Sequence, residues 1–228
     1  MLKGQLQQIS SQKNQPGFTI IESLVAVIVL GILMTAIAPT IVISTATRVQ
    51  SRRVELATQA ARAYIDGLSS RNIPAPPISK NDRVNAPTTS LNCNDLTADN
   101  GYCSSPKDSS YKVFCVDGTG DGKCTKEESK DLIVQAFGFN PDSTEASSGY
   151  KLRVRVYRAD AFKDNKALIP NENSTGKKVT QSTFTGGIGN VKAPLVEIVT
   201  EISTQQTTFQ KFCSRLENST NTNSKCSN

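Results

Sequence analysis

The chain of 228 residues contains no histidine, and its six cysteines include no pair spaced as C-x-x-C. Histidine is the side chain that most often transfers protons at neutral pH, and no serine or cysteine here has another recognisable base partner. No glycine-rich stretch carries the lysine of a phosphate-binding loop at the required spacing. Zinc sites, which are built mainly from cysteine and histidine, are disfavoured for the same reasons. The sequence therefore predicts a protein that is not an enzyme.

The chain also lacks a strong charge of either sign. It has 26 basic and 20 acidic residues, a formal net charge of +6. Lys3 and Lys13 precede the first apolar segment, so without residues 1–17 the balance is 24 basic against 20 acidic residues, or +4. This excess is too small to predict binding to nucleic acid. The remaining 228 − 17 = 211 residues are enough for one helical stalk and one modest globular head.

Residues 18–43 form an apolar segment that carries one charge, Glu22. About 20 apolar residues in a helix span the roughly 30 Å hydrocarbon core of a membrane. A lone carboxylate in such a segment costs on the order of 3 kcal/mol, so Glu22 needs a reason beyond anchoring. The small residue Gly17 precedes the apolar segment, whereas the cleavage site of a secretory signal follows it. Cleavage at Gly17 would keep the segment in the mature chain. The alternative is a plain signal anchor with an incidental glutamate.

The N-terminal segment resembles that of type IV prepilins and pseudopilins through Gly17, Phe18, Thr19, Glu22, Gly31 and Pro39. The resemblance implies that prepilin peptidase cuts between Gly17 and Phe18 and methylates the new amine. It also implies that Glu22 neutralises the amine of a neighbouring subunit during assembly. Two opposite charges, each unfavourable alone in an apolar bundle, are tolerable when they pair across subunits. The implied partners are the peptidase, other pilins or pseudopilins and the inner-membrane assembly platform.

The resemblance implies an α+β, type IV pilin-like ladle, in which a long N-terminal helix packs on an antiparallel β-sheet head. Residues 1–17 would be the prepilin leader and residues 18–71 the helix, with residues 18–43 as its transmembrane and filament-core part. Residues 72–89 would be a linker, and residues 90–228 a disulfide-containing, β-rich head. The protein would span the inner membrane once with its head in the periplasm, and would be extracellular after assembly into a filament.

Beyond residue 43 the helix is predicted to become amphipathic and to end near Ser70. Pro39 should loosen its first half, because proline removes one backbone donor. Four prolines between Asn72 and Thr89 indicate the helix stop and the linker. The residues predicted to form the buried stripe of the second half are Val49, Leu56, Ala60, Ala63, Tyr64, Gly67 and Leu68.

The head is predicted to contain two neighbouring antiparallel strands, Tyr150–Arg158 and Pro194–Ser203. Both alternate with period two, so one face of the first is basic and one face of the second is acidic. Opposite charges across two strands contribute up to about 1 kcal/mol per pair. Residues 111–116 and 132–139 are further strand candidates, although the second could instead continue a helix. The charged residues concerned are Lys151, Arg153, Arg155, Glu197 and Glu201.

The basic row of the first strand is predicted to be a solvated face that Glu197 and Glu201 partner. The alternative is a ligand surface for acidic polysaccharide or DNA.

The six cysteines all follow the apolar segment, which favours disulfides in an exported chain. Six cysteines allow 15 connectivities. We predict nearest-neighbour pairing among Cys93, Cys103, Cys115, Cys124, Cys213 and Cys226, because each lies close in sequence to another. Closing a loop of about ten residues stabilises by roughly 2.7 kcal/mol in the chain-entropy model.

The stretch CVDGTGDGKCTKEE, residues 115–128, fits an EF-hand-like calcium loop. Oxygen donors would come from Asp117, Thr119, Asp121, the carbonyl of Lys123 and Glu128, with Gly122 permitting the turn. Threonine at the third place and the lack of a clear preceding helix depart from the motif. Some pseudopilin heads bind calcium, which supports the interpretation by analogy only. The alternative is a plain acidic turn.

The predicted function is therefore structural, as a minor pilin or pseudopilin of a filament used in motility, adhesion or secretion. Residues 48–70 also resemble the helix of cyanobacterial pseudopilins for hormogonium polysaccharide secretion. Two rival hypotheses are a type II secretion pseudopilin and a calcium-dependent adhesion or polysaccharide-binding module that the filament presents. A surface aromatic cluster beside the calcium loop would favour the binding module.

Overall fold

The computed structural model describes residues 17–96, 100–172, 178–182, 190–204 and 207–217. The chain forms two compact units, which divide between Ser44 and Thr45. One helix, α1 (Ile20–Ser69), contributes to both units, and its bounds agree with the predicted helix. It continues through Pro39, where the sequence predicted loosening, because one proline removes only one backbone donor from the helix.

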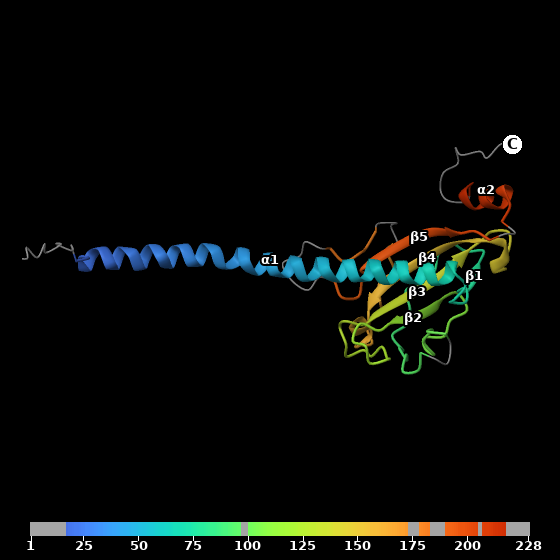
Figure 1. Ribbon diagram of the computed structural model, residues 1–228, viewed down its shortest axis with the longest axis horizontal. Coiled ribbons are helices and arrows are strands. Elements are labelled where there is room, and N and C mark those ends of the chain that lie inside the picture. Colours follow the sequence, from blue (N-terminus) through green and yellow to red (C-terminus); the bar gives the residue numbers. More distant parts are fainter. Residues whose placement is uncertain (1–16, 97–99, 173–177, 183–189, 205–206, 218–228) are drawn as a thin grey trace, which may run out of the picture. The chain divides into compact units, whose positions relative to one another are not determined.

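A five-stranded sheet forms the centre of the second unit. Its strands are β1 (Ile78–Ser79), β2 (Lys112–Val116), β3 (Leu132–Phe139), β4 (Tyr150–Arg158) and β5 (Val196–Ile202). The order is β1-β3-β4-β5, with β2 also paired to β3, and Figure 1 shows the long strands side by side. Every pairing is antiparallel except that of β1 with β3, which is parallel. The α+β prediction is confirmed, and β3 is a strand rather than a helix.

The second half of α1 packs on one face of the sheet. Ala57, Ala60, Ala61, Tyr64 and Leu68 form a core with apolar residues of β3 and β4, namely Val134, Ala136, Leu152, Val154 and Val156.

The predicted buried stripe of α1 was wrong in part. Val49 and Leu56 are 53% and 38% exposed, and Ala63 is exposed. The methyl side chains of Ala57 and Ala61 occupy the contact instead, because they let the helix axis lie close to the sheet.

A second core lies on the other face of the sheet, under irregular segments. Ile133, Phe137, Tyr157 and Phe162 belong to it, the last from the short 3-10 helix Ala159–Phe162. Val84, 8% exposed, packs there as well, and β1 lies within the segment predicted as a linker. Ile78–Ser79 and Val84, within the predicted linker, thus pack with the head.

Disulfides close two of the irregular segments. Cys93 pairs with Cys103, and Cys115 pairs with Cys124, as nearest-neighbour pairing predicted. Cys213 lies in the C-terminal helix α2 (Phe209–Glu217) and is also disulfide-bonded. Cys226 lies outside the described residues, so the pairing of Cys213 with Cys226 stays a prediction.

Candidate assembly site and the polar clusters of the head

Thr19 caps the N-terminus of α1. Its hydroxyl oxygen accepts a hydrogen bond from the backbone N–H of Glu22 at 3.3 Å. Its carbonyl accepts the N–H groups of Glu22 and Ser23 at 3.1 and 3.2 Å. The sequence Thr-Ile-Ile-Glu has the residue types of a capping box, in which a helix starts at threonine and a glutamate follows three residues later. Glu22 is thus held in the first helical turn, and Gly17 and Phe18 precede the helix.

Glu22 lies where the helix favours a negative charge. The unpaired N–H groups of the first turn give this end of a helix a partial positive charge, which stabilises an exposed carboxylate by about 0.3–1 kcal/mol. A new ammonium on Phe18 would add a positive charge to the same end. Glu22 is exposed at this end of the helix.

The first unit exposes apolar side chains on every side of α1. Phe18, Ile20 and Ile21 are 85%, 90% and 70% exposed, and the pattern continues through Ile43 at 43%. Among the described residues, α1 is the one helix long and apolar enough to cross a membrane. A helix that is apolar all round needs an apolar environment, such as a membrane or a helix bundle. Its length and composition are compatible with membrane anchoring.

Residues 12–38 match the family model of the prokaryotic N-terminal methylation motif. The match includes Gly17, Phe18 and Glu22, and it covers a small part of the chain. The chain therefore carries a type IV prepilin-like motif, which indicates a pilin-type subunit that a prepilin peptidase processes and that assembles with other pilins. No curated protein and no solved structure matches the chain.

In the head, Asp117 organises the loop that the sequence predicted to bind calcium. Its carboxylate accepts the N–H groups of Gly122, Gly120 and Thr119 at 2.6, 2.6 and 2.9 Å, and the Thr119 hydroxyl at 3.0 Å. The N–H groups of Gly122 and Gly120 contribute most to lowering the pKa of Asp117 below its usual value. Gly120 and Gly122 have φ of 82° and 79°, where glycine carries no steric cost.

Asp131, which sequence reasoning missed, holds the two ends of this loop. Its fully buried carboxylate accepts the N–H groups of Gly118 at 3.1 Å and Thr125 at 3.2 Å. The one available signal was its position directly before the apolar strand β3. A carboxylate at such a place is expected either to be solvated or to bond backbone N–H groups.

The predicted calcium ligands do not converge in this structure. Within the described ranges, no three His, Cys, Asp or Glu residues form a group that could hold a metal ion. Asp117 is occupied by the loop's own N–H groups, and Asp121 accepts the N–H of Lys123 at 3.0 Å. Thr119, Lys123 and Glu128 are exposed or half-exposed around the same loop. The loop is a hydrogen-bonded turn in this structure, and calcium binding stays a prediction.

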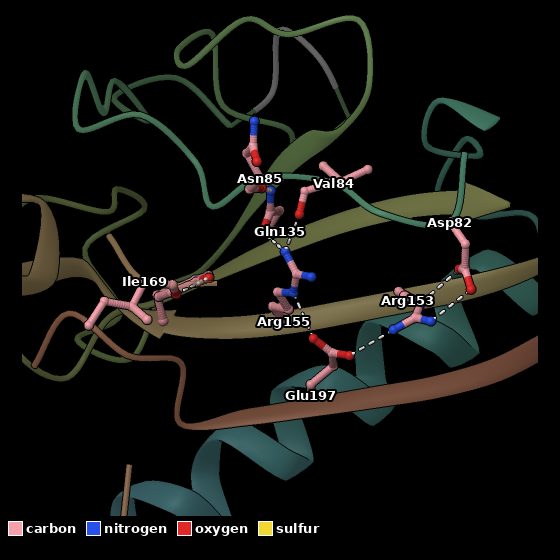
Figure 2. Close-up of polar contacts among 9 residues, drawn as sticks. Asp82, Val84, Asn85, Gln135, Arg153, Arg155, Ile169 and Glu197 are labelled. Carbon is pink, nitrogen blue, oxygen red and sulfur yellow. Dashed lines mark hydrogen bonds and ion pairs between the residues drawn. The ribbon is translucent and has the colours of Figure 1, made fainter. Parts of the chain in front are cut away.

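The basic row of β4 lies in a buried network rather than on a solvated face. Lys151 and Arg155 are 7% and 5% exposed. Figure 2 shows Arg155 between Glu197 of β5 and the carbonyl of Val84, to which it donates at 2.6 and 2.7 Å. Arg153 bridges Glu197 at 3.3 Å and Asp82 at 2.8 and 2.9 Å.

The prediction of a solvated row was wrong because the segment around Asp82 and Val84 covers it. The predicted partnership with Glu197 and the antiparallel register are confirmed, since Arg155 lies opposite Glu197 and bonds it. The predicted partnership with Glu201 was wrong, because Glu201 accepts from Arg215 of α2 at 3.0 Å. Buried cations already paired with carboxylates are poor docking points for an acidic polymer. The row therefore does not supply the alternative surface for polysaccharide or DNA.

Three aromatic side chains of the head form a buried cluster in the core. Tyr64, Tyr102 and Phe114 contact one another with ring centroids 5.2–6.3 Å apart, and both tyrosines are 1% exposed. The two tyrosine hydroxyls bond each other at 2.7 Å, and Tyr102 also donates to the carbonyl of Pro74. Desolvation raises the pKa of Tyr64 well above its usual value. This cluster joins α1 to the sheet and offers no surface platform for a sugar.

Proposed function

We propose that the protein is a minor pilin or pseudopilin, a structural subunit of a type IV pilus-like filament. The match to the methylation motif at residues 12–38 carries the proposal. Phe18 is the mature N-terminus, and the apolar part of α1 anchors the subunit in the inner membrane before it enters the filament core. The head faces the periplasm before assembly and the outside afterwards.

Glu22 is the assembly residue in this proposal. The ammonium of Phe18 and the carboxylate of Glu22 are each costly in an apolar helix bundle, and pairing between subunits removes both costs. The capped start of α1 supports this role, because it fixes Glu22 in the first turn, close to the new N-terminus. The charge pair then favours a neighbour that is shifted along the filament axis until the two groups meet.

Secretion, including secretion of a polysaccharide, and motility are the uses that we propose for the filament. The resemblance of residues 48–70 to cyanobacterial polysaccharide-secretion pseudopilins supports the first use and rests on sequence alone. Identification of the genes beside this one, as pilus motors or as glycosyltransferases, distinguishes the two.

The first experiment is mass spectrometry of the N-terminal peptide of the membrane-bound protein. We expect a peptide that begins at Phe18 and carries one added methyl group, since Gly17 and Phe18 lie at the predicted peptidase site. The same peptide from cells without the prepilin peptidase should begin in residues 1–17. An unprocessed leader in peptidase-containing cells would rule out the pilin proposal.

We also propose that the 117–128 loop binds calcium weakly outside the cell. Extracellular sites of this kind have dissociation constants of about 0.1–1 mM, so 10 mM calcium would stabilise the head by roughly 1.4–2.7 kcal/mol. Binding would require the Asp117 carboxylate to exchange N–H contacts for the ion. The open space around Gly120 and Gly122 leaves room for that change.

Calcium should therefore raise the melting temperature of a soluble fragment of residues 45–228. Asp121→Ala should abolish the shift without unfolding the fragment, because the disulfides and the sheet do not depend on the ion. Asp108→Ala, which alters a similar exposed aspartate turn outside the loop, should keep the shift. If wild type and Asp121→Ala melt alike in calcium and in chelator, the loop is an ordinary acidic turn.

A further inference from the structure

A cavity of about 540 Å³ lies at the C-terminal end of α1. Its walls come from the helix end, the short 3-10 helix Ala146–Ser148, the start of β4 and the end of β5. Leu68 and Ile202 contribute apolar surface, and Arg71, Tyr150, Ser147 and Ser203 contribute polar groups. The volume is within the usual range of small-ligand sites, about 300–1,000 Å³.

Tyr150 brings an unused donor to this cavity. Its side chain is 2% exposed, yet its hydroxyl has no hydrogen-bond partner in the part of the chain that the structure describes. Burial raises the pKa of Tyr150 to about 12, so the hydroxyl keeps its proton at neutral pH. The hydroxyl oxygen is not one of the fully buried unpartnered polar atoms, so it is open to the cavity and can donate to a ligand there.

Arg71 occupies a backbone position that favours glycine. Its φ is 62°, in the left-handed region, where it closes the end of α1 as the N–H groups of Asn72 and Ile73 bond the carbonyl of Gly67. Backbone geometry therefore gives no reason for an arginine here. Its exposed guanidinium makes no ion pair or side-chain hydrogen bond with any described residue, unlike the neutralised arginines of β4.

We propose that this cavity binds a carboxylate-bearing sugar unit, such as a uronic acid of a polysaccharide. Arg71 takes the carboxylate, and the hydroxyls of Tyr150, Ser147 and Ser203 bond the sugar hydroxyls. The last two also lack partners among the described residues. The apolar walls contact the C–H faces of the ring. No carboxylate from the described residues lines the cavity to repel the ligand.

The same chemistry argues against a peptide as the occupant. Extended peptides are held mainly through backbone hydrogen bonds to a strand edge or to a nest of N–H groups. Of the edge strand β5, Ile202 alone lines this cavity, so little strand edge is available to a peptide. The polar side chains of the lining are Arg71 and five hydroxyls, of which those of Ser69 and Thr204 already donate to backbone carbonyls. That set suits a compact ligand with one carboxylate and several hydroxyls.

The test uses the full-length mature protein in detergent and isothermal titration with two probes, trigalacturonate and the neutral β-1,4-galactotriose. We expect the acidic trimer to bind and the neutral trimer to bind at least about tenfold more weakly, because the charge-assisted contact to Arg71 is lost. Arg71→Gly should cause a similar loss while keeping the fold, since glycine adopts the left-handed conformation freely. Tyr150→Phe should weaken binding severalfold.

Arg83→Gln is the matched control, because Arg83 is also exposed and does not line the cavity. It should bind the acidic trimer as wild type does. Equal binding of both trimers, no binding of the acidic trimer, or unchanged binding by Arg71→Gly would each overturn the proposal. Binding of a peptide with a free C-terminal carboxylate in place of the sugar would also overturn it. Because the subunit is tested outside any filament, the result is independent of the assembly role of Glu22.

Discussion

Glu22→Val should leave the protein stable in the membrane and should nearly abolish its incorporation into filaments. Removing a charge from the apolar segment makes insertion easier, so the amount in the membrane should not fall. In the filament, however, the ammonium of the neighbouring Phe18 would lose its partner. An uncompensated buried charge costs about 3–5 kcal/mol, which corresponds to a loss of more than about 100-fold in the equilibrium for joining. Immunoblots of membrane and sheared-filament fractions measure both quantities.

Two further variants separate the charge of Glu22 from its position. Glu22→Gln keeps the size and the polar character of the side chain and should fail in assembly almost as severely as valine. Glu55→Gln removes a carboxylate from the exposed half of the same helix, where Glu55 pairs with Arg52 at 3.0 Å with both side chains more than half exposed. It should assemble normally. Normal assembly of Glu22→Gln would show that the negative charge is not what the filament requires.

Glu197→Ala should strongly destabilise the head, by about 3–5 kcal/mol, because it leaves two arginines without their shared carboxylate. The side chains of Glu197 and Arg155 are each 6% exposed, so water cannot replace the lost contact. Arg155 would keep only its bonds to the carbonyl of Val84 and to Gln135. Urea denaturation of a fragment of residues 45–228 gives the change in the free energy of unfolding.

An exposed ion pair in the same fragment serves as a control for the effect of burial. Glu55→Ala breaks the Arg52 pair, whose side chains are 65% and 53% exposed, and should cost no more than about 1 kcal/mol. Replacing both buried partners, as Arg155→Met with Glu197→Leu, should recover much of the stability lost in Glu197→Ala, since no unpaired charge then remains. Equal costs for Glu197→Ala and Glu55→Ala would contradict the assignment of Glu197 to a buried network.

Local patterns in the sequence predicted most of the elements of the fold. The alternation in residues 150–158 gave β4 with its observed bounds, and the opposite charges of β4 and β5 predicted their antiparallel pairing. These features depend on side chains close in sequence or directly opposite across a ladder. The long helix was also predicted, because the apolar segment continues into an amphipathic pattern that extends to Ser69, and Pro39 alone did not end it.

Contacts between distant segments were not predictable in the same way. Alternation showed that Lys151, Arg153 and Arg155 share a face, but it could not show that Asp82 and Val84 cover that face from about 70 residues away. The buried face of α1 differs from the predicted stripe for a related reason. Large apolar residues such as Val49 and Leu56 predict burial by their hydrophobicity, whereas the sheet contacts the smaller Ala57 and Ala61 because these allow close approach.

The candidate sites likewise divide into features that local sequence predicts and features that depend on contacts formed after folding. Gly17, Phe18 and Glu22 could be predicted as site residues because their motif is contiguous, and the family match covers residues 12–38. Their roles in processing and assembly stay predictions. The spacing also predicted the acidic loop. It did not predict that Asp117 would accept backbone N–H groups or that Asp131 would hold the loop ends. Those roles depend on where backbone donors lie after folding, which spacing alone does not specify.

The most direct test of the filament proposal is mass spectrometry of purified, sheared filaments from cells with and without the prepilin peptidase. If the protein is a pilin-type subunit, filaments from peptidase-containing cells should yield its head peptides together with an N-terminal peptide that begins at methylated Phe18. Cells without the peptidase should hold the unprocessed protein in the membrane and none in the filament fraction. Processed protein that stays in the membrane and never enters filaments, in cells that do assemble them, would contradict the proposal.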